Sequence, residues 1–321
     1  MSPKACADLP TIDFSKLDLN NPSNNPEEWE FIRYQVKKAV EEYGCFKANS
    51  SKISSELTKA VLRDIEELFA LPLETKMRNV ADMHNGGYIG KATFTPLFES
   101  LGFLDPIDLE KIERITDALW PEGKPSFSKN MQSYSVQVLG MEKIMRTMIL
   151  ESLGLEKYLE EHINSTTTSL RIMKYDAPEP GEPQIALAPH IDQDMITILY
   201  QNEVGGLEVQ SKVNGDWINV NLSPNNFLVL IGETFQAWTN GRTYAPIHRV
   251  TMSGNKDRYS VGTFTATKFG YIVKAPEEVV DEQNPLLYRP FDFMEVNQRF
   301  QQDLLSNSQK DIPTIKDYFG V

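Results

Sequence analysis

The chain has 321 residues, 40% of them hydrophobic, and a formal net charge of −13 at pH 7. This length allows one substantial core or two domains, and the negative charge argues against nucleic acid as a partner. No apolar run approaches the roughly 20 residues that span a bilayer. We therefore expect a globular protein that binds neither nucleic acid nor a membrane.

The N-terminal residues and the cysteines predict the compartment. Residues 1–8 contain no hydrophobic signal segment, and no transit peptide rich in arginine and serine is visible. Cys6 and Cys45 are the only cysteines, too few for a disulfide framework, which favours a reducing compartment. We expect a cytoplasmic protein, and a monomer.

Three helices are predicted in the first half of the chain. Asn25-Pro26 begins the first, whose apolar residues keep helical spacing until Gly44. The second runs from about 54 to 70 and is stopped by Pro72. The third lies near residues 130–152, and we interpret its methionine-rich side as helix core.

Glycines and aromatic residues lie between the second and third helices. The segment 85–90 contains three glycines, which indicate a turn or mobile loop, and Phe94, Phe98 and Phe103 follow. These aromatics have two interpretations: they pack against a sheet, or they form a lid or wall over a substrate.

After Leu170 the sequence predicts short strands and tight turns. Asn214-Gly215, a strong hairpin signal, lies between the strand-like segments 207–210 and 217–220. Residues 227–231 form a continuous apolar run, typical of a buried strand. Strands at this rhythm favour a double-sheet jelly roll whose open end can hold a ligand. The tail from Pro290 to Phe300 is predicted to be a helix that could return over the mouth of the barrel.

His190, Asp192 and His248 form the most informative pattern. His190 and Asp192 are two residues apart, so on a strand they would point to the same side and could bind one ion. His248 follows in another strand-like run and would be brought in by a sheet folding back on itself. Two imidazoles and one carboxylate leave half of an iron(II) coordination sphere open. Arg258, which follows, has the geometry to hold a dicarboxylate by a paired hydrogen bond.

Each residue of this pattern also has an ordinary interpretation. A strand histidine such as His248 is usually a satisfied core or edge residue, and a lone Arg258 would most often lie at the surface or in an ion pair. Asp194 shares the predicted face of His190, so it is an alternative carboxylate ligand. We prefer Asp192 because it is nearest to His190.

The chain resembles the plant-type 2-oxoglutarate- and iron(II)-dependent dioxygenases over essentially its whole length. The matching motifs are found in the same order and at compatible distances. They run from Leu9-Pro-Thr-Ile-Asp13 through the His190 segment, Gly205-Gly-Leu-Glu-Val209 and Pro246-Ile-His-Arg-Val250 to Arg258-Tyr-Ser260 and Asn284-Pro-Leu-Leu-Tyr288. Within the family, the subgroup that modifies plant specialised metabolites is the most similar.

The resemblance implies a role for each motif residue. His190, Asp192 and His248 would be the iron ligands and thereby the catalytic centre. Arg258 and Ser260 would bind the distal carboxylate of 2-oxoglutarate, and the Tyr175 hydroxyl would contact its iron-binding end. Met173 departs from the family pattern, which usually has asparagine there. A thioether is only a weak acceptor, so we expect Met173 to shape the pocket instead.

The resemblance also implies the architecture. We expect a mainly β protein with helices, in which a double-stranded β-helix (jelly-roll) core is wrapped by N-terminal helices. Residues 1–100 would be a helical region packed on the core and not independent of it. Residues 101–321 would form the dioxygenase region, with the jelly-roll core at about 168–270.

The implied activity is that of an oxidoreductase that uses Fe(II), 2-oxoglutarate as cosubstrate and O2, with ascorbate as a candidate reductant. We expect hydroxylation of a small, lipophilic plant specialised metabolite; desaturation or oxidative ring closure by the same chemistry are alternatives. No basic cluster beyond the Arg258 motif points to an acidic substrate. The expected substrate-binding wall is mostly apolar and consists of Tyr88, Phe94, Phe103, Met173, Leu187, Phe235, Phe264 and Phe291.

Two other functions remain open from the sequence. One is an iron oxidase that works without 2-oxoglutarate, which the presence of Arg258, Ser260 and Tyr175 disfavours. The other is a non-catalytic protein that binds a small molecule, which the complete set of three metal-ligand residues disfavours.

Overall fold

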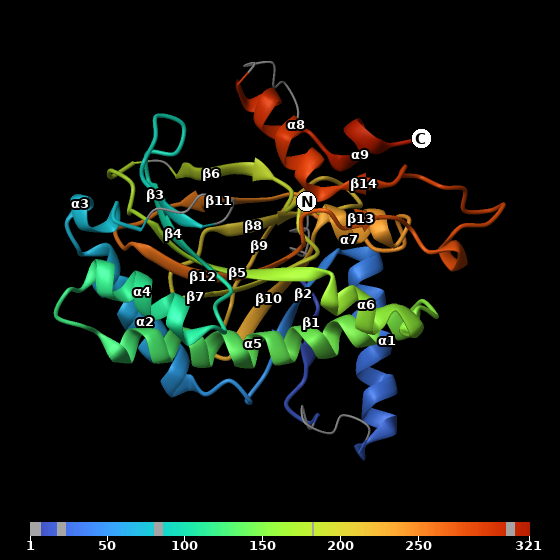
Figure 1. Cartoon of the computed structure of the whole chain (residues 1–321), viewed down its shortest axis with the longest axis horizontal. Coiled ribbons are helices and arrows are strands. Elements are labelled where there is room, and N and C mark those ends of the chain that lie inside the picture. Colours follow the sequence, from blue (N-terminus) through green and yellow to red (C-terminus); the bar gives the residue numbers. More distant parts are fainter. Residues whose placement is uncertain (1–7, 18–23, 80–85, 182, 306–311) are drawn as a thin grey trace, which may run out of the picture.

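Two β-sheets face each other in the computed structural model, which describes residues 8–17, 24–79, 86–181, 183–305 and 312–321 (Figure 1). The larger sheet has eight strands in the order β1 (Thr11–Asp13), β2 (Cys45–Asn49), β10 (Asn226–Ile231), β7 (Ile196–Gln201), β12 (Arg258–Thr267), β5 (Thr166–Tyr175), β4 (Phe98–Leu104) and β3 (Gly87–Ile89). The smaller sheet has the order β6 (Gln184–His190), β11 (His248–Met252), β8 (Leu207–Gln210) and β9 (Trp217–Asn219). Neighbouring strands in both sheets are antiparallel, except that β1 is parallel to β2.

The predicted strands are confirmed where the sequence signal was strongest. The Asn214-Gly215 turn joins β8 and β9, which pair as a hairpin with Val209 opposite Ile218. The apolar run 227–231 lies in β10, which is flanked by β2 and β7. A strand with neighbours on both sides and packing on both faces needs this continuous apolar character.

The predicted N-terminal helices are confirmed, with small shifts at their ends. In α1 (Pro26–Glu42) the Asn25 side chain accepts a hydrogen bond from the Glu28 amide, and Gly44 follows the helix with φ of +70°. The helix α2 (Ser55–Phe69) is capped by the Ser54 side chain. A Cβ at position 44 would lie 2.2 Å from the Tyr244 carbonyl oxygen, so glycine is required there for space as well as for conformation.

The third helix, α5 (Pro125–Ser152), is longer than predicted and lies along the outer face of the large sheet (Figure 1). It begins at Pro125, five residues before the predicted start, because proline fits the first turn of a helix. Met141, Met145 and Met148 are fully buried in the core that this helix forms with the sheet. The interpretation of the methionine-rich side as helix core is therefore confirmed.

The space between the two sheets is a second, smaller core. Leu228 and Leu230 of β10 point into it, whereas Phe227, Val229 and Ile231 point to the helices on the other side. The inner positions of the other strands follow the same alternation. This arrangement is the jelly-roll core that the sequence predicted, and its interior holds the residues discussed below.

The remaining elements cover the rim and the ends of the sheets. They are α3 (Leu73–Lys76), α4 (Leu109–Leu119), η2 (Glu156–Tyr158), α6 (Leu159–Asn164), α7 (Glu233–Trp238), β13 (Ile272–Val273), η3 (Glu277–Val279), β14 (Phe291–Asp292), α8 (Phe293–Leu305) and α9 (Ile315–Phe319). The predicted tail helix corresponds to α8, whose first residue, Phe293, lies beside the ends of β5 and β12. Among the described residues, no helix has both the length and the apolar character that a membrane span requires.

Candidate active site

Strand pairing brings the two histidines of the motif together. His190 is the last residue of β6 and His248 is the first residue of β11, and the two lie directly opposite each other in the small sheet. Their ring centroids are 4.2 Å apart. The sheet thus folds back as expected, and pairing in register places two imidazoles at one end of the barrel.

Asp192 reaches the same point from a loop. The sequence predicted that Asp192 and His190 would share a strand, but β6 ends at His190 and Asp192 lies in the turn that follows. The backbone carbonyl of Asp192 accepts a hydrogen bond of 2.8 Å from the Glu233 amide, which holds this turn. Asp192 Oδ1 lies 3.8 Å from His190 Nε2 and 3.6 Å from His248 Nε2. The ligand atoms of the three residues all lie within 4.8 Å of one another, close enough to bind one ion.

Neighbouring groups orient the three side chains. His190 Nδ1 is 2.9 Å from the Ala188 carbonyl oxygen, and His248 Nδ1 is 3.3 Å from the Pro246 carbonyl oxygen. When each Nδ1–H donates to its carbonyl, each Nε2 is left as a free metal ligand. Thr197 donates to Asp192 Oδ2 at 2.6 Å, so Oδ1 stays available. This donor set fits the two-histidine, one-carboxylate site of non-haem Fe(II) enzymes.

The histidine at the mouth is neutral at physiological pH. Loss of solvation around its ring, together with the nearby His248, lowers the pKa of His190 to about 4. A neutral imidazole is the form that coordinates a metal. The site is thus prepared for a cation without first having to lose a proton from His190.

Asp194, the alternative ligand, has a different place. It is buried, and it is not among the residues whose ligand atoms converge. Burial, and then the charge of Asp192, raises the pKa of Asp194 well above its usual range. Thr197 Oγ1 lies 3.1 Å from Asp194 Oδ2, and it already donates its one hydrogen to Asp192. The Thr197 hydroxyl thus lies between the two carboxylates, and the geometry favours Asp192 as the ligand.

Arg258 lies at the far end of the barrel interior and has only neutral partners. It is 1% exposed, donates to Gln201 Oε1 at 2.9 Å and to Ser260 Oγ at 3.3 Å, and within the described part of the chain has no ion pair. A buried guanidinium without a counter-ion fits the distal carboxylate of 2-oxoglutarate, which a paired hydrogen bond would hold. Gln201 was missed in the sequence analysis. The alternating pattern of β7 could have identified it, because Thr197 and Gln201 are the polar residues on the inner face of an otherwise apolar strand.

Tyr175 and Met173 lie beside Arg258. Tyr175 is opposite Arg258 in the β5–β12 ladder, and the guanidinium carbon is 4.8 Å from the centre of the tyrosine ring. The Tyr175 hydroxyl donates to Met173 Sδ at 3.6 Å, and burial raises the pKa of Tyr175. Both side chains point into the barrel. We expected the Tyr175 hydroxyl to contact the cosubstrate and Met173 to shape the pocket, and both positions are compatible with these roles.

Three of the eight residues expected to form the substrate wall lie in the barrel interior: Met173, Leu187 and Phe264. The structure does not bring the other five to the metal end. Phe103, Phe235 and Phe291 are buried in the core outside the barrel, where they pack against Phe127, against His162 and Trp238, and against Phe319, respectively. Phe94 is 84% exposed. For Phe103 the reason is strand alternation, because odd-numbered residues of β4 face the helices.

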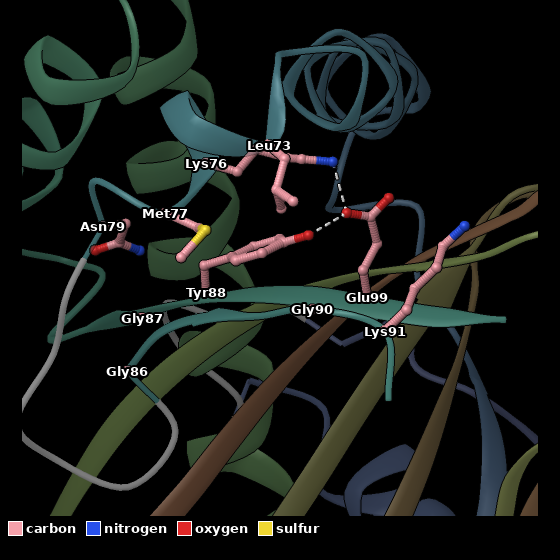
Figure 2. A pocket seen from close by; sticks show the side chains of 10 residues that line it. All are labelled: Leu73, Lys76, Met77, Asn79, Gly86, Gly87, Tyr88, Gly90, Lys91 and Glu99. Carbon is pink, nitrogen blue, oxygen red and sulfur yellow. Dashed lines mark hydrogen bonds and ion pairs between the residues drawn. The ribbon is translucent and has the colours of Figure 1, made fainter. Parts of the chain in front are cut away.

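Tyr88 lines a different cavity, of about 670 Å³, on the outer side of β3 and β4 (Figure 2). Its hydroxyl donates to Glu99 Oε2 at 2.7 Å, and Lys76 Nζ binds the same oxygen at 2.6 Å. Figure 2 shows these three side chains converging beneath α3. The three metal-ligand residues are absent from its lining, so this cavity is separate from the candidate active site.

A smaller cavity of about 220 Å³ lies at the rim of the barrel. Its lining includes Ser169, Phe264 and Phe293. Phe264 is opposite Thr197 in the β7–β12 ladder, and Thr197 binds the Asp192 carboxylate. The rim cavity is therefore connected to the barrel interior through Phe264, although none of the three converging residues lines it.

Comparison with known proteins agrees with this geometry. Residues 167–267 match the model of the 2OG-Fe(II) oxygenase superfamily, and residues 9–111 match that of the N-terminal region of non-haem dioxygenases in morphine synthesis. The probable 2-oxoglutarate-dependent dioxygenase AOP1 of Arabidopsis thaliana is 40% identical over 306 residues, covering 94% of this chain and 99% of the relative. The 2-oxoglutarate-dependent dioxygenase AOP3 of the same plant is 31% identical, with coverages of 90% and 92%.

Solved structures share the fold. The dioxygenase for auxin oxidation 1 of Arabidopsis thaliana, determined with 2-oxoglutarate, has a TM-score of 0.77 and 25% identity, covering 86% of this chain and 99% of its own. The dioxygenase for auxin oxidation of rice has a TM-score of 0.80 and 23% identity, with coverages of 98% and 100%. The jelly-roll fold predicted from the sequence is thereby confirmed.

Proposed function

Because the chain belongs to the 2-oxoglutarate- and Fe(II)-dependent oxygenase superfamily, we propose that it hydroxylates a small, mainly apolar plant metabolite. The chain is a 2-oxoglutarate-dependent dioxygenase, with Fe(II) and 2-oxoglutarate as its cofactor and cosubstrate. The observation that carries the proposal is the combination, in one barrel, of three converging ligand atoms with a buried Arg258 that has no ion pair among the described residues.

Each residue of the site has a distinct task. His190 Nε2, His248 Nε2 and Asp192 Oδ1 would hold the iron, and Thr197 keeps the Asp192 carboxylate oriented. Arg258, positioned by Gln201, would fix the distal carboxylate of 2-oxoglutarate together with Ser260. When bound, the iron, 2-oxoglutarate and dioxygen supply the oxidising power that removes a hydrogen atom from the substrate.

The apolar part of the interior supports a mainly apolar substrate. Leu187 and Phe264 are partly buried between the sheets, close to the level of the metal ligands, and leave apolar surface for a substrate to cover. The outcome of the reaction depends on which substrate carbon this wall holds nearest to the iron. Hydroxylation needs one such carbon, whereas desaturation or ring closure needs a second reacting position held close by.

The other functions lose support from the site. An oxidase that does not use 2-oxoglutarate has no need of a buried Arg258 that is held by neutral partners. A binding protein without catalysis has no need of a complete ligand set. We also propose that the protein acts as a cytoplasmic monomer without a nucleic-acid partner. Its two cysteines support the cytoplasmic location, and its net charge of −13 supports the absence of a nucleic-acid partner.

A substrate screen tests the proposal. Purified protein with Fe(II), 2-oxoglutarate and ascorbate is incubated with a panel of plant metabolites, and succinate release and product mass are measured. We expect at least one compound to gain one oxygen atom, with succinate formed in step, and no reaction by His190→Ala. A product that has lost two hydrogens would identify desaturation or ring closure instead. Oxidation that proceeds equally without 2-oxoglutarate would overturn the proposal.

A further inference from the structure

The buried cations of this protein fall into two groups. Among the described residues the buried cationic side chains are Lys47, Lys76, Arg146, Arg171 and Arg258. Three are paired with carboxylates: Lys47 with Asp8, Lys76 with Glu99, and Arg146 with Glu142. Arg258 is explained by 2-oxoglutarate. Arg171 is the remaining cation, and no function described so far uses it.

Arg171 points into the barrel from β5. It alternates with Leu170 and Ile172, which face the helices, and it shares the inner face with Met173 and Tyr175. Its neighbours in register are Gly102 on β4 and Gly262 on β12, neither of which has a side chain. A Cβ at position 262 would lie 2.6 Å from the Phe264 ring, so glycine at this position lets the Phe264 ring pack against the backbone of β12.

The hydrogen bonding of Arg171 does not balance its charge. The guanidinium donates from Nη1 to Ser100 Oγ at 2.7 Å, and this is its one hydrogen bond to the described residues. A guanidinium has five N–H donors, and a hydroxyl neither satisfies them nor neutralises the charge. The side chain is only 7% exposed, and burial lowers the pKa of Arg171 to about 10, so it remains a cation at neutral pH.

Arg171 and Arg258, on the same inner face, are therefore both buried cations without an ion pair to a described residue. Both are buried, both are bonded to neutral side chains, and neither has a carboxylate within ion-pair distance in the described part of the chain. A buried charge without a partner is costly. For Arg258 the balancing anion is the cosubstrate. By the same argument, a second anion would balance the charge of Arg171.

The position of Arg171 indicates which molecule supplies this anion. On the inner face of β5 it is flanked by Met173, towards the Arg258 end, and by Ser169, which lines the rim cavity. A substrate that enters at the rim and passes Phe264 would meet Arg171 before it could reach Arg258.

We propose that Arg171 pairs with an oxyanion, a carboxylate or a sulfate, carried by the substrate. The substrate would then have an apolar body against Leu187 and Phe264 and one anionic group at Arg171. This inference rests on the proposed function and narrows its substrate class. It also revises the expectation that no basic group besides the Arg258 motif points to an acidic substrate.

Matched pairs of ligands test the inference. Protein loaded with Fe(II) and 2-oxoglutarate without oxygen is titrated by calorimetry with small carboxylic acids and their methyl esters, and with aryl sulfates and their parent phenols. We expect the anion of at least one pair to bind about tenfold or more tightly than its neutral partner, as a charge-assisted hydrogen bond provides. Whether the acids or the sulfates show the preference identifies the oxyanion.

Variants assign the preference to Arg171. Arg171→Met should abolish it, Arg171→Lys should restore part of it because the charge remains without the planar fork, and Arg114→Met, at an exposed arginine of α4, should leave it unchanged. The inference is wrong if no anion binds wild type better than its neutral partner, or if Arg171→Met keeps the preference. It is also wrong if Arg171→Met weakens 2-oxoglutarate binding as strongly as Arg258→Met. Failure of wild type to bind iron or 2-oxoglutarate in the same samples would instead contradict the proposed function.

Discussion

The two faces of the large sheet treat buried charge differently. On the outer face, beneath the helices, Arg146 binds Glu142 and Lys76 binds Glu99, so each cation has its own carboxylate. On the inner face, the partners of Arg171 and Arg258 among the described residues are hydroxyl and amide groups. Strand alternation places Arg171 and Arg258 on the inner face and Glu99 of β4 on the outer face. Arg146 and Glu142 lie on α5, and Lys76 lies on α3.

This difference distinguishes cations that stabilise the fold from cations that could bind a ligand. A buried pair that is complete within the chain stabilises one arrangement of helix and sheet and needs nothing from outside. The charge of a buried cation without a carboxylate is neutralised only when an anion binds.

The largest effect is expected on the inner face at the metal. Asp192→Ala removes the only carboxylate among the converging ligand atoms. Iron affinity should fall by more than the roughly 10–100-fold typical of residues that only orient a ligand, and turnover should be lost. Metal content after dialysis and succinate release measure these two effects. Asp194→Asn is the matched control and should stay within that 10–100-fold range; if it loses iron as Asp192→Ala does, Asp194 is the ligand.

The outer face should respond in stability instead. Arg146→Met leaves Glu142 buried without its partner, and the free energy of unfolding should fall by about 3–5 kcal/mol. Urea unfolding measures the change. In the exposed pair on α8, Arg299→Met should cost less than about 1 kcal/mol. Equal losses in the two variants would show that burial does not distinguish these pairs.

The neighbour of Arg146 adds a dependence on pH. Burial, and then the charge of Arg146, lowers the pKa of His162 well below its usual range, so the folded protein holds the neutral ring. The unfolded chain binds a proton there below about pH 6.5, so the free energy of unfolding should fall with acid by about 1.4 kcal/mol per pH unit in that range. His162→Gln should show a slope smaller by this amount. Parallel curves for the two proteins would contradict the assignment.

No loss of stability is expected for Arg171→Met. No described carboxylate loses a partner in this variant. Its free energy of unfolding should therefore equal or exceed that of wild type, within about 1–2 kcal/mol. Urea unfolding beside Arg146→Met provides the comparison. A loss as large as that of Arg146→Met would place Arg171 among the structural cations.

Local patterns in the sequence predicted most of the fold. Helical spacing and end signals located α1 and α2, and Asn214-Gly215 located the β8–β9 hairpin, because each depends on neighbouring residues. The three residues whose ligand atoms converge were selected from the sequence by residue type and spacing. The reason given for Asp192 was wrong, however, because a turn held by Glu233 places it there, and such a contact between distant segments leaves no local pattern.

The pocket wall was harder to predict for the same reason. Phe103 and Ser100 differ by three positions on β4, so they face opposite sides of the sheet, and the sequence does not say which side is the barrel. Aromatic residues were taken as the wall, but three of them lie in the helix-side core. Arg171 was overlooked because the absence of a partner becomes visible only in three dimensions.

The most direct test of this account is a 2-oxoglutarate titration of the Fe(II)-loaded protein without oxygen, which follows the visible metal-to-ligand charge-transfer band. Wild type should give a saturable band, Arg171→Met should give the same band at the same midpoint, and Arg258→Met should need a much higher concentration of 2-oxoglutarate. This result would show that the two inner-face arginines serve different anions. No band in iron-loaded wild type, or equal shifts in the two variants, would contradict the account.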